Sequence, residues 1–169
     1  ASGRYYPKFW QRPWEQVFHE IIYDYQNYGV HDMAFYDDAL LYRAEESFLP
    51  LLKALKKANL PIRFHLPNSI HARYVTHEIA ELMLECHFKT IRISLEFSDT
   101  INQQKTGNKV DNSIFEKAIQ SFIQAGYASY ELEVYLLFGL PGLQVNDYEC
   151  SIAYVNDLGL KPRLSLYSP

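Results

Sequence analysis

Residues 134–142 read VYLLFGLPG, an uncharged run followed by a turn rich in glycine and proline. Five successive residues without charge, from Val134 to Phe138, predict a strand covered on both faces, as in a parallel sheet wrapped by helices. Gly139 and Gly142 leave room for a ligand or another backbone to approach the end of this strand. Ligands bind at this end of the strands in open α/β sheets and barrels, so the turn is a candidate binding site. A plain strand-to-helix turn explains the motif equally well.

The composition of the chain limits the class of protein. Its 169 residues, 48% hydrophobic and 15% aromatic, fit one globular domain with a sizeable core, so we expect residues 1–169 to form a single domain. A formal net charge of −4, with no block of like charge, argues against a nucleic-acid partner. The apolar runs are too short to cross a bilayer and no signal peptide is visible. We therefore expect a cytoplasmic protein without a membrane partner.

The sequence contains two cysteines, Cys86 and Cys150. This number suits a reducing cytosol better than a disulfide framework. Their spacing matches no zinc or iron–sulfur motif, so we expect no metal ligand in this chain. The chain lacks an initiating methionine and stops directly after an apparent strand. We expect it to be a fragment of a longer protein.

Helices and strands are predicted to alternate along the chain. The predicted helices lie around 13–29, 48–55, 77–83, 113–125 and 148–158, and the predicted strands are 30–36, 60–66, 90–95, 132–138 and 164–167. Most of these units are about thirty residues long, as expected for βα repeats that build a parallel sheet. Five strands are too few to close an eight-stranded barrel, so the sheet is either open or curved into part of a barrel.

Polar side chains and glycines follow the predicted strands, where parallel strands would bring them to one concave site. In chain order they are Asp37 and Asp38, His65 and Asn68, Glu96, Gly139 to Gly142, and Ser165 with Tyr167. The loop 97–112 is also longer than a usual connection, which is a mild indication of function.

Several of these residues have a structural alternative. Asp37 and Asp38 could simply start a turn and cap the next helix. A histidine in a strand, such as His65, is more often a satisfied core residue than a ligand. Glu96 follows an apolar strand, so its carboxylate must be paired or must face a ligand. Arg92 is either the partner of Glu96 or a separate anchor, and the sequence does not separate the two.

An ordered set of motifs in this chain resembles the radical S-adenosylmethionine (SAM) superfamily, in particular the iron–sulfur oxidoreductase branch often fused to cobalamin-binding domains. The motifs are Phe35-Tyr36-Asp37-Asp38, His65-Leu66-Pro67-Asn68, Ile93-Ser94-Leu95-Glu96, residues 135–142 and Tyr167-Ser168-Pro169. The resemblance covers nearly the whole chain and depends on the order of the motifs rather than on any single one.

The resemblance implies an α/β fold, a partial (β/α)6 TIM-like barrel of parallel strands, here without its first strand and cluster loop. In this family the first strand is followed by Cys-x-x-x-Cys-x-x-Cys, which ligates a [4Fe–4S] cluster, and this chain has no such motif. Residues 1–6, ASGRYY, resemble the segment that follows the third cysteine in some members. We therefore expect the chain to begin just past the motif, and Cys86 and Cys150 to be core or surface thiols.

The resemblance also implies cofactors and residue roles. The cofactors would be SAM, the [4Fe–4S] cluster and, in a flanking domain, cobalamin. The implied cofactor-binding residues are Asp37 and Asp38 for the methionine amino group, Ser94 and Glu96 for the ribose, and Phe138, Gly139, Leu140 and Tyr167 for the adenine. The family usually has a Gly-Gly-Glu type motif where this chain has the two aspartates. His65, Asn68 and Arg92 would face the cofactor carboxylate or the substrate.

The implied reaction is reductive cleavage of SAM, in which an electron from the cluster generates a 5′-deoxyadenosyl radical that abstracts hydrogen from a small or macromolecular substrate. The electron would come from a donor such as flavodoxin or ferredoxin. Without the three cysteines, we expect the chain itself to be inactive.

Two other functions stay open. One is a βα enzyme that holds magnesium or manganese with its carboxylates and histidine, namely Asp37, Asp38, His65 and Glu96. The other is a non-catalytic βα scaffold that binds a partner through the aromatic amino-terminal arm.

Overall fold

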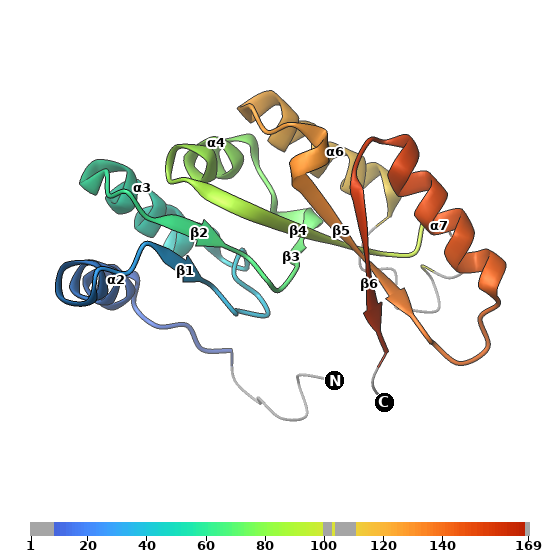
Figure 1. Ribbon diagram of the computed structural model, residues 1–169, viewed down its shortest axis with the longest axis horizontal. Helices are drawn as coiled ribbons and strands as arrows, with labels where there is room; N and C mark the ends of the chain where they lie inside the picture. Colours follow the sequence, from blue (N-terminus) through green and yellow to red (C-terminus); the bar gives the residue numbers. More distant parts are fainter. Residues whose placement is uncertain (1–8, 100–102, 104–110, 168–169) are drawn as a thin grey trace.

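The computed structural model describes residues 9–99, 103 and 111–167. Its core is one parallel sheet in the order β1-β2-β4-β5-β6, with β3 beside β4 (Figure 1). The strands are β1 Asp32–Ala34, β2 Arg63–His65, β3 Ile70–His71, β4 Phe88–Glu96, β5 Leu132–Phe138 and β6 Lys161–Leu166. Over the described residues β1 and β6 form the two edges, so the sheet is not closed. The fold is α/β, an open part of a TIM-like barrel, as the sequence predicts.

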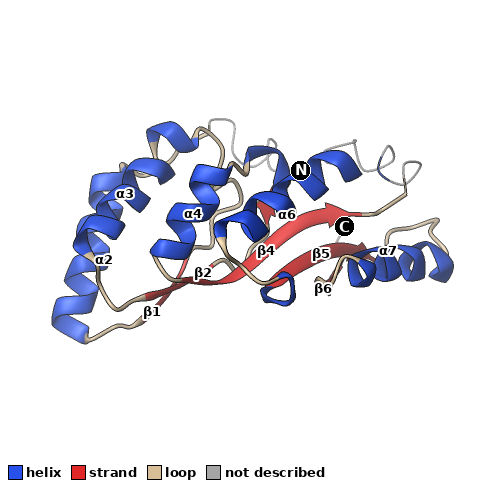
Figure 2. Ribbon diagram, turned by 90° about the horizontal axis from the view of Figure 1, so that it is seen from above, coloured by secondary structure: helices blue, strands red, loops and turns tan. Residues whose placement is uncertain are grey.

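The described part of the chain includes five α-helices. They are α2 Trp14–Tyr28, α3 Phe48–Ala58, α4 His77–Glu85, α6 Asn112–Ala125 and α7 Val145–Asp157, with short 3-10 turns η1 Ala44–Glu46, η2 Ala72–Tyr74 and η3 Ser129–Glu131. In both views α3, α4 and α6 lie along one side of the strands (Figure 1 and Figure 2). Within the described ranges, no helix is both long and apolar enough to cross a membrane.

The helix starts follow from capping side chains. Thr76 Oγ1 accepts a hydrogen bond from the Ile79 N–H at 3.2 Å and so begins α4, which confirms the prediction. Helix α6 begins one residue earlier than predicted, because Asp111 Oδ1 accepts from the Ile114 N–H at 2.9 Å. Helix α7 begins at Val145, three residues before the predicted start.

The prediction that β5 is covered on both faces is wrong. Buried residues alternate along this strand with half-buried ones, and Phe138 at its end is 41% exposed. The buried side chains are Leu132, Val134 and Leu136. Among the described helices, α3, α4 and α6 lie along the convex side of the curved sheet, so the alternate side chains of β5 line its concave side.

Two short strands lie in this part of the chain, β2 within the predicted strand 60–66 and β3 beyond it. The chain pairs with β4 over Arg63–His65, leaves the sheet, and pairs with β4 again over Ile70–His71. Pro67 lies in the gap, and a proline has no N–H to donate to a sheet. A short loop at 66–69 therefore sits where the sequence predicts the end of a continuous strand.

An aromatic cluster fills the core between β1, β2, β4 and α3. The ring of Phe88, which is 1% exposed, lies 5.1 Å from that of Phe64 and 5.9 Å from those of Phe35 and Phe48. These contacts join the first three βα units into one packed layer.

Candidate functional site

The loops that follow β1 and β2 are joined by a side chain at the carboxyl end of the sheet. Asn68 Nδ2 donates to the Tyr36 carbonyl oxygen at 2.8 Å and to Asp38 Oδ1 at 3.3 Å. The structure thus brings together two predicted site residues, Asp38 and Asn68, from different strands.

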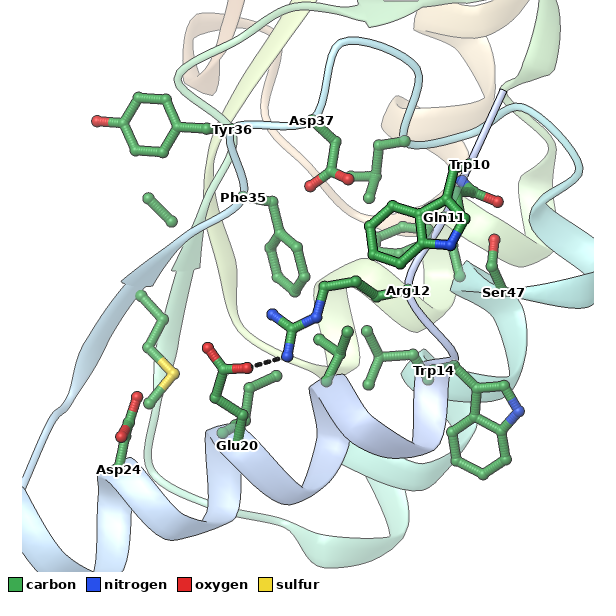
Figure 3. Close-up of a pocket in the computed structure, with 17 residues that line it drawn as sticks. Trp10, Gln11, Arg12, Trp14, Glu20, Asp24, Phe35, Tyr36, Asp37 and Ser47 are labelled. Atoms are coloured by element: carbon green, nitrogen blue, oxygen red, sulfur yellow. Dashed lines mark hydrogen bonds and ion pairs between the residues drawn. The ribbon is translucent and has the colours of Figure 1, made fainter. Parts of the chain in front are cut away.

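The neighbouring carboxylate, Asp37, has a different environment. It points into a cavity of about 460 Å³ between α2 and β1, beside Trp10, whereas Tyr36 points away (Figure 3). Burial raises the pKa of Asp37, and the nearby Asp38 charge adds to the shift. This cavity runs along the free edge of β1 rather than over the strand ends. Asp37 and Asp38 therefore serve different sites.

The end of β4 has an unusual backbone. The register with β5 shifts between Ser94 and Glu96, and Glu96 has a φ of 69°. A residue with a side chain rarely adopts this left-handed conformation, and such positions cluster at functional sites. The Ser94 hydroxyl oxygen lies 2.5 Å from that of Ser69, so Ser94 holds the 66–69 loop.

The ends of β5 and β6 meet. The Phe138 carbonyl oxygen accepts from the Tyr167 N–H at 2.7 Å, and the Gly139 N–H donates to Tyr148 Oη at 3.2 Å. Gly139 has a φ of 83°, a left-handed conformation that favours glycine over residues with a side chain. Phe138, Gly139 and Tyr167, three of the residues that the sequence analysis names, thus lie together where β5 and β6 end.

The turn after Gly139 follows from its sequence. The Leu143 N–H donates to the Leu140 carbonyl oxygen at 3.3 Å, and Gly142 has a φ of 85°. Proline followed by a residue with positive φ is the pattern of a type II turn.

Part of the long loop after β4 is held by amide side chains. Gln103 Nε2 donates to the Phe97 carbonyl oxygen at 2.8 Å and to Asn112 Oδ1 at 2.7 Å, while Asn112 Nδ2 donates to the Ser98 carbonyl oxygen at 2.8 Å. Residues 100–102 and 104–110 of this loop lie outside the described residues, as do residues 1–8 and 168–169 with the predictions made on them.

Both ring nitrogens of His65 have partners, but the side chain is half-buried and lies outside the core, so His65 is not the core histidine of the structural alternative. Its Nδ1 lies 2.9 Å from Thr90 Oγ1, and its Nε2 lies 3.1 Å from Asp32 Oδ1. Asp32 also accepts from Arg63 Nε at 2.7 Å. The sequence analysis missed Asp32 and Arg63, although both belong to short strands whose polar residues alternate with apolar ones.

Arg92 pairs with Glu133 on β5 and not with Glu96. Of the two roles that the sequence left open for Arg92, the partner of Glu96 is therefore wrong. Arg92 Nε donates to Glu133 Oε2 at 2.7 Å, and Arg163 donates to Glu133 Oε1 at 2.6 Å. Burial alone would raise the pKa of Glu133, but the hydrogen bonds from Arg163 and Arg92 outweigh it and lower that pKa. Period-two alternation in β5 and β6 was the available signal for Glu133 and Arg163.

Acid should weaken the fold through Asp32. Hydrogen bonds from Arg63 and then His65 lower its pKa from 3.8 to about 2, so the folded state favours the carboxylate. Its contribution is complete above pH 3.8 and is lost as the pH falls through about 2. We expect the melting temperature of the wild-type chain to fall more steeply across this window than that of Asp32→Asn. Parallel pH profiles for the two proteins would contradict the assignment.

The side chains proposed for a divalent metal do not converge. His65 is bound to Asp32 and Thr90, Asp38 is bound to Asn68, and Asp37 faces the other cavity. Across 9–99, 103 and 111–167, no three His, Cys, Asp or Glu side chains are grouped as a metal site. The metal-dependent alternative built on these residues is therefore wrong.

The cysteines do not suit an iron–sulfur cluster. Cys86 is buried at the end of α4, where its Sγ lies 3.3 Å from the Leu52 carbonyl oxygen, and burial followed by the Glu85 charge raises its pKa to about 12. Cluster ligands are thiolates, and this thiol stays protonated. Cys150 is exposed on α7. Of the two cysteines predicted to be core or surface thiols, Cys86 lies in the core and Cys150 at the surface.

No protein-family model matches the sequence, and no curated protein is significantly similar to it. Solved structures of radical SAM enzymes do match. The methyltransferase TsrM from Kitasatospora setae, solved with tryptophan and a SAM analogue, has a TM-score of 0.75 and 15% identity over 92% of this chain and 30% of that chain. Another TsrM structure, with cobalamin and a [4Fe-4S] cluster, has a TM-score of 0.74 and 16% identity, covering 92% and 31%.

A different radical SAM enzyme gives the same result. Coproporphyrinogen III oxidase (HemN) from Escherichia coli has a TM-score of 0.69 and 12% identity, covering 92% of this chain and 37% of that one. At such identities the likeness establishes the fold, and the fold is the open parallel barrel of radical SAM enzymes. The chain spans about a third of the length of these structures.

Proposed function

We propose that this chain is the SAM-binding part of a radical SAM enzyme. The observation that carries the proposal is the set of strand ends on this fold. The sheet matches a radical SAM enzyme over 92% of the chain, and polar or glycine-containing segments lie at the ends of its strands. These segments are Asp38 with Asn68, then Glu96, and then Phe138 to Leu140 with Tyr167.

The strand ends have the chemistry that SAM needs. Asp38, oriented by Asn68, is a carboxylate that would accept from the methionine ammonium group. Glu96 would accept hydrogen bonds from the ribose hydroxyls. Phe138 and the backbone around Gly139 would flank the adenine. Asp37 and Ser94 are less suited to direct contact, because Asp37 faces the cavity beside α2 and the Ser94 hydroxyl contacts Ser69.

When bound, SAM supplies a 5′-deoxyadenosyl radical through reductive cleavage, and the residues of this chain orient it and exclude water. The cluster that delivers the electron would be held by cysteines outside these 169 residues, and the electron donor would be a flavodoxin or ferredoxin. Since a TsrM structure contains cobalamin, we include cobalamin in a flanking domain in the proposal.

The test is formation of 5′-deoxyadenosine by the whole protein, purified and reconstituted anaerobically. We expect wild-type protein to form it and Glu96→Ala to form it about 100-fold more slowly, the effect of losing two charge-assisted hydrogen bonds of about 1.5 kcal/mol each. Glu149→Ala, an exposed change on α7, is the matched control and should be unaffected. A cluster-loaded protein that forms no 5′-deoxyadenosine, or full activity of Glu96→Ala, would refute the proposal.

A further inference from the structure

The 66–69 loop, which interrupts the strand beside β4, is fastened to the concave side of the sheet. The Pro67 carbonyl oxygen accepts from Arg92 Nη1 at 2.8 Å and from Tyr135 Oη at 2.9 Å. Both lone pairs of this oxygen are therefore used. The contact between Ser69 and Ser94 fastens the other end of the loop.

The donors to Pro67 are themselves held in place. Arg92 Nη1 also donates to Tyr135 Oη at 3.2 Å, and the guanidinium carbon of Arg92 lies 5.6 Å from the centre of the Tyr135 ring. On its other side Arg92 is bound by Glu133. A guanidinium fixed by a carboxylate, a phenol and a carbonyl loses much of its rotational freedom.

The same loop orients the proposed SAM contact. Asn68 directly follows Pro67, and its side-chain amide binds both the Tyr36 carbonyl oxygen and the Asp38 carboxylate. A continuous series of hydrogen bonds thus runs from β5 and β4, through the 66–69 loop, to the loop after β1.

Tyr135 and Arg92 do not themselves lie at the strand ends. Tyr135 pairs in register with Ser94, and Leu136 pairs with Glu96, the last residue of β4. The Tyr135 hydroxyl and the Arg92 Nη1 are directed at the loop. The hydrogen bonds that connect these two side chains with Asp38 run through Pro67 and Asn68.

We propose that Tyr135 and Arg92 are positioning residues, which fix the Asp38 carboxylate for the SAM ammonium group through the 66–69 loop. This inference rests on the proposed function, in which Asp38 binds SAM. Tyr135→Phe tests it with the smallest change, because the ring stays and only the bond to Pro67 and the acceptor for Arg92 are lost.

The experiment uses the reconstituted whole protein with two measurements. Hydrogen–deuterium exchange of Tyr135→Phe should be faster than wild type in peptides covering 35–41 and 66–71, because the loop has lost one of the two hydrogen bonds to the Pro67 carbonyl oxygen. The KM for SAM should rise about fivefold with kcat changed less than twofold, since an oriented carboxylate contributes to ground-state binding. Tyr130→Phe, at an exposed tyrosine on η3, is the control and should change neither.

Hydrogen–deuterium exchange and the KM for SAM together distinguish a failure of the positioning role from a failure of the proposed function. Unchanged exchange at 35–41 in Tyr135→Phe would overturn the inference whatever SAM does. If wild-type protein binds SAM and Tyr135→Phe has the wild-type KM, the positioning role is wrong while the proposed function stands. If wild-type protein binds no SAM, the proposed function fails. The hydrogen bonds from Tyr135 and Arg92 through the 66–69 loop then have no role in positioning a SAM ligand. Arg92→Lys, which keeps a charge beside Glu133 but loses the planar fork, should reproduce the faster exchange.

Discussion

Glu133→Ala should lower the free energy of unfolding by about 3 kcal/mol, measured by urea denaturation monitored by circular dichroism. The Glu133 side chain is only 13% exposed and binds Arg92 and Arg163 with separate oxygens. Removing it leaves two guanidinium groups side by side on the concave face without their anion. Breaking a buried pair from one side costs about 3–5 kcal/mol, and we take the lower end because Arg163 is half exposed.

Two further variants make this result interpretable. Glu133→Gln keeps the shape and one acceptor, so it should lose less stability than Glu133→Ala. Glu149→Ala removes an exposed carboxylate on α7 and should stay within about 0.5 kcal/mol of wild type. A loss below about 1 kcal/mol for Glu133→Ala would mean that the ion pairs of Glu133 with Arg92 and Arg163 do not stabilise the sheet.

Phe88→Ala should lower the free energy of unfolding by about 3–5 kcal/mol. Phe88 begins β4, the central strand, and its ring touches those of Phe35, Phe48 and Phe64. Alanine would leave a cavity under three rings that are fixed by β1, β2 and α3, so the site cannot collapse easily. A domain of this size has about 5–15 kcal/mol in total, so the variant should be close to unfolding.

The matched change is Phe138→Ala on β5. Phe138 is also aromatic and lies in a strand, but it is 41% exposed, so we expect a loss of stability well below that of Phe88→Ala. Comparable losses for the two variants in the same denaturation experiment would show that the aromatic cluster is not the centre of the core.

Much of the fold could be predicted because its signals are local. Apolar residues at helical spacing and the Thr76 cap identify α2 and α4, and the order of helices and strands indicates a parallel sheet. The strand beside β4 ends before Pro67, as the sequence predicts, because proline has no N–H to donate to a sheet. The two-residue strand β3 that follows was missed. The half-buried face of β5 was missed because a run without charge looks the same whether one face is covered or both.

The candidate site was predicted in part for the same reason. Glycine at 139 and polar residues directly after strands indicate a strand-end site, and Asp38, Asn68 and Gly139 lie where that pattern predicts. Asp37 and Asp38 were assigned to one cofactor group, but residues next to each other in a loop can face different surroundings, and here Asp37 lines the cavity beside α2 while Asp38 binds Asn68.

Sequence alone determined the order of the elements, the helix caps and the glycine turn at 139–142, since each depends on residues within a few positions of one another. Only the tertiary structure decided how the concave face is connected. Its hydrogen bonds join Arg92 to Glu133 across 41 positions and Tyr135 to Pro67 across 68. Such pairs are set by strand order, register and curvature, which are properties of the packed sheet. The physical reason is distance along the chain: a charge or hydroxyl in a strand has many possible partners until folding selects one.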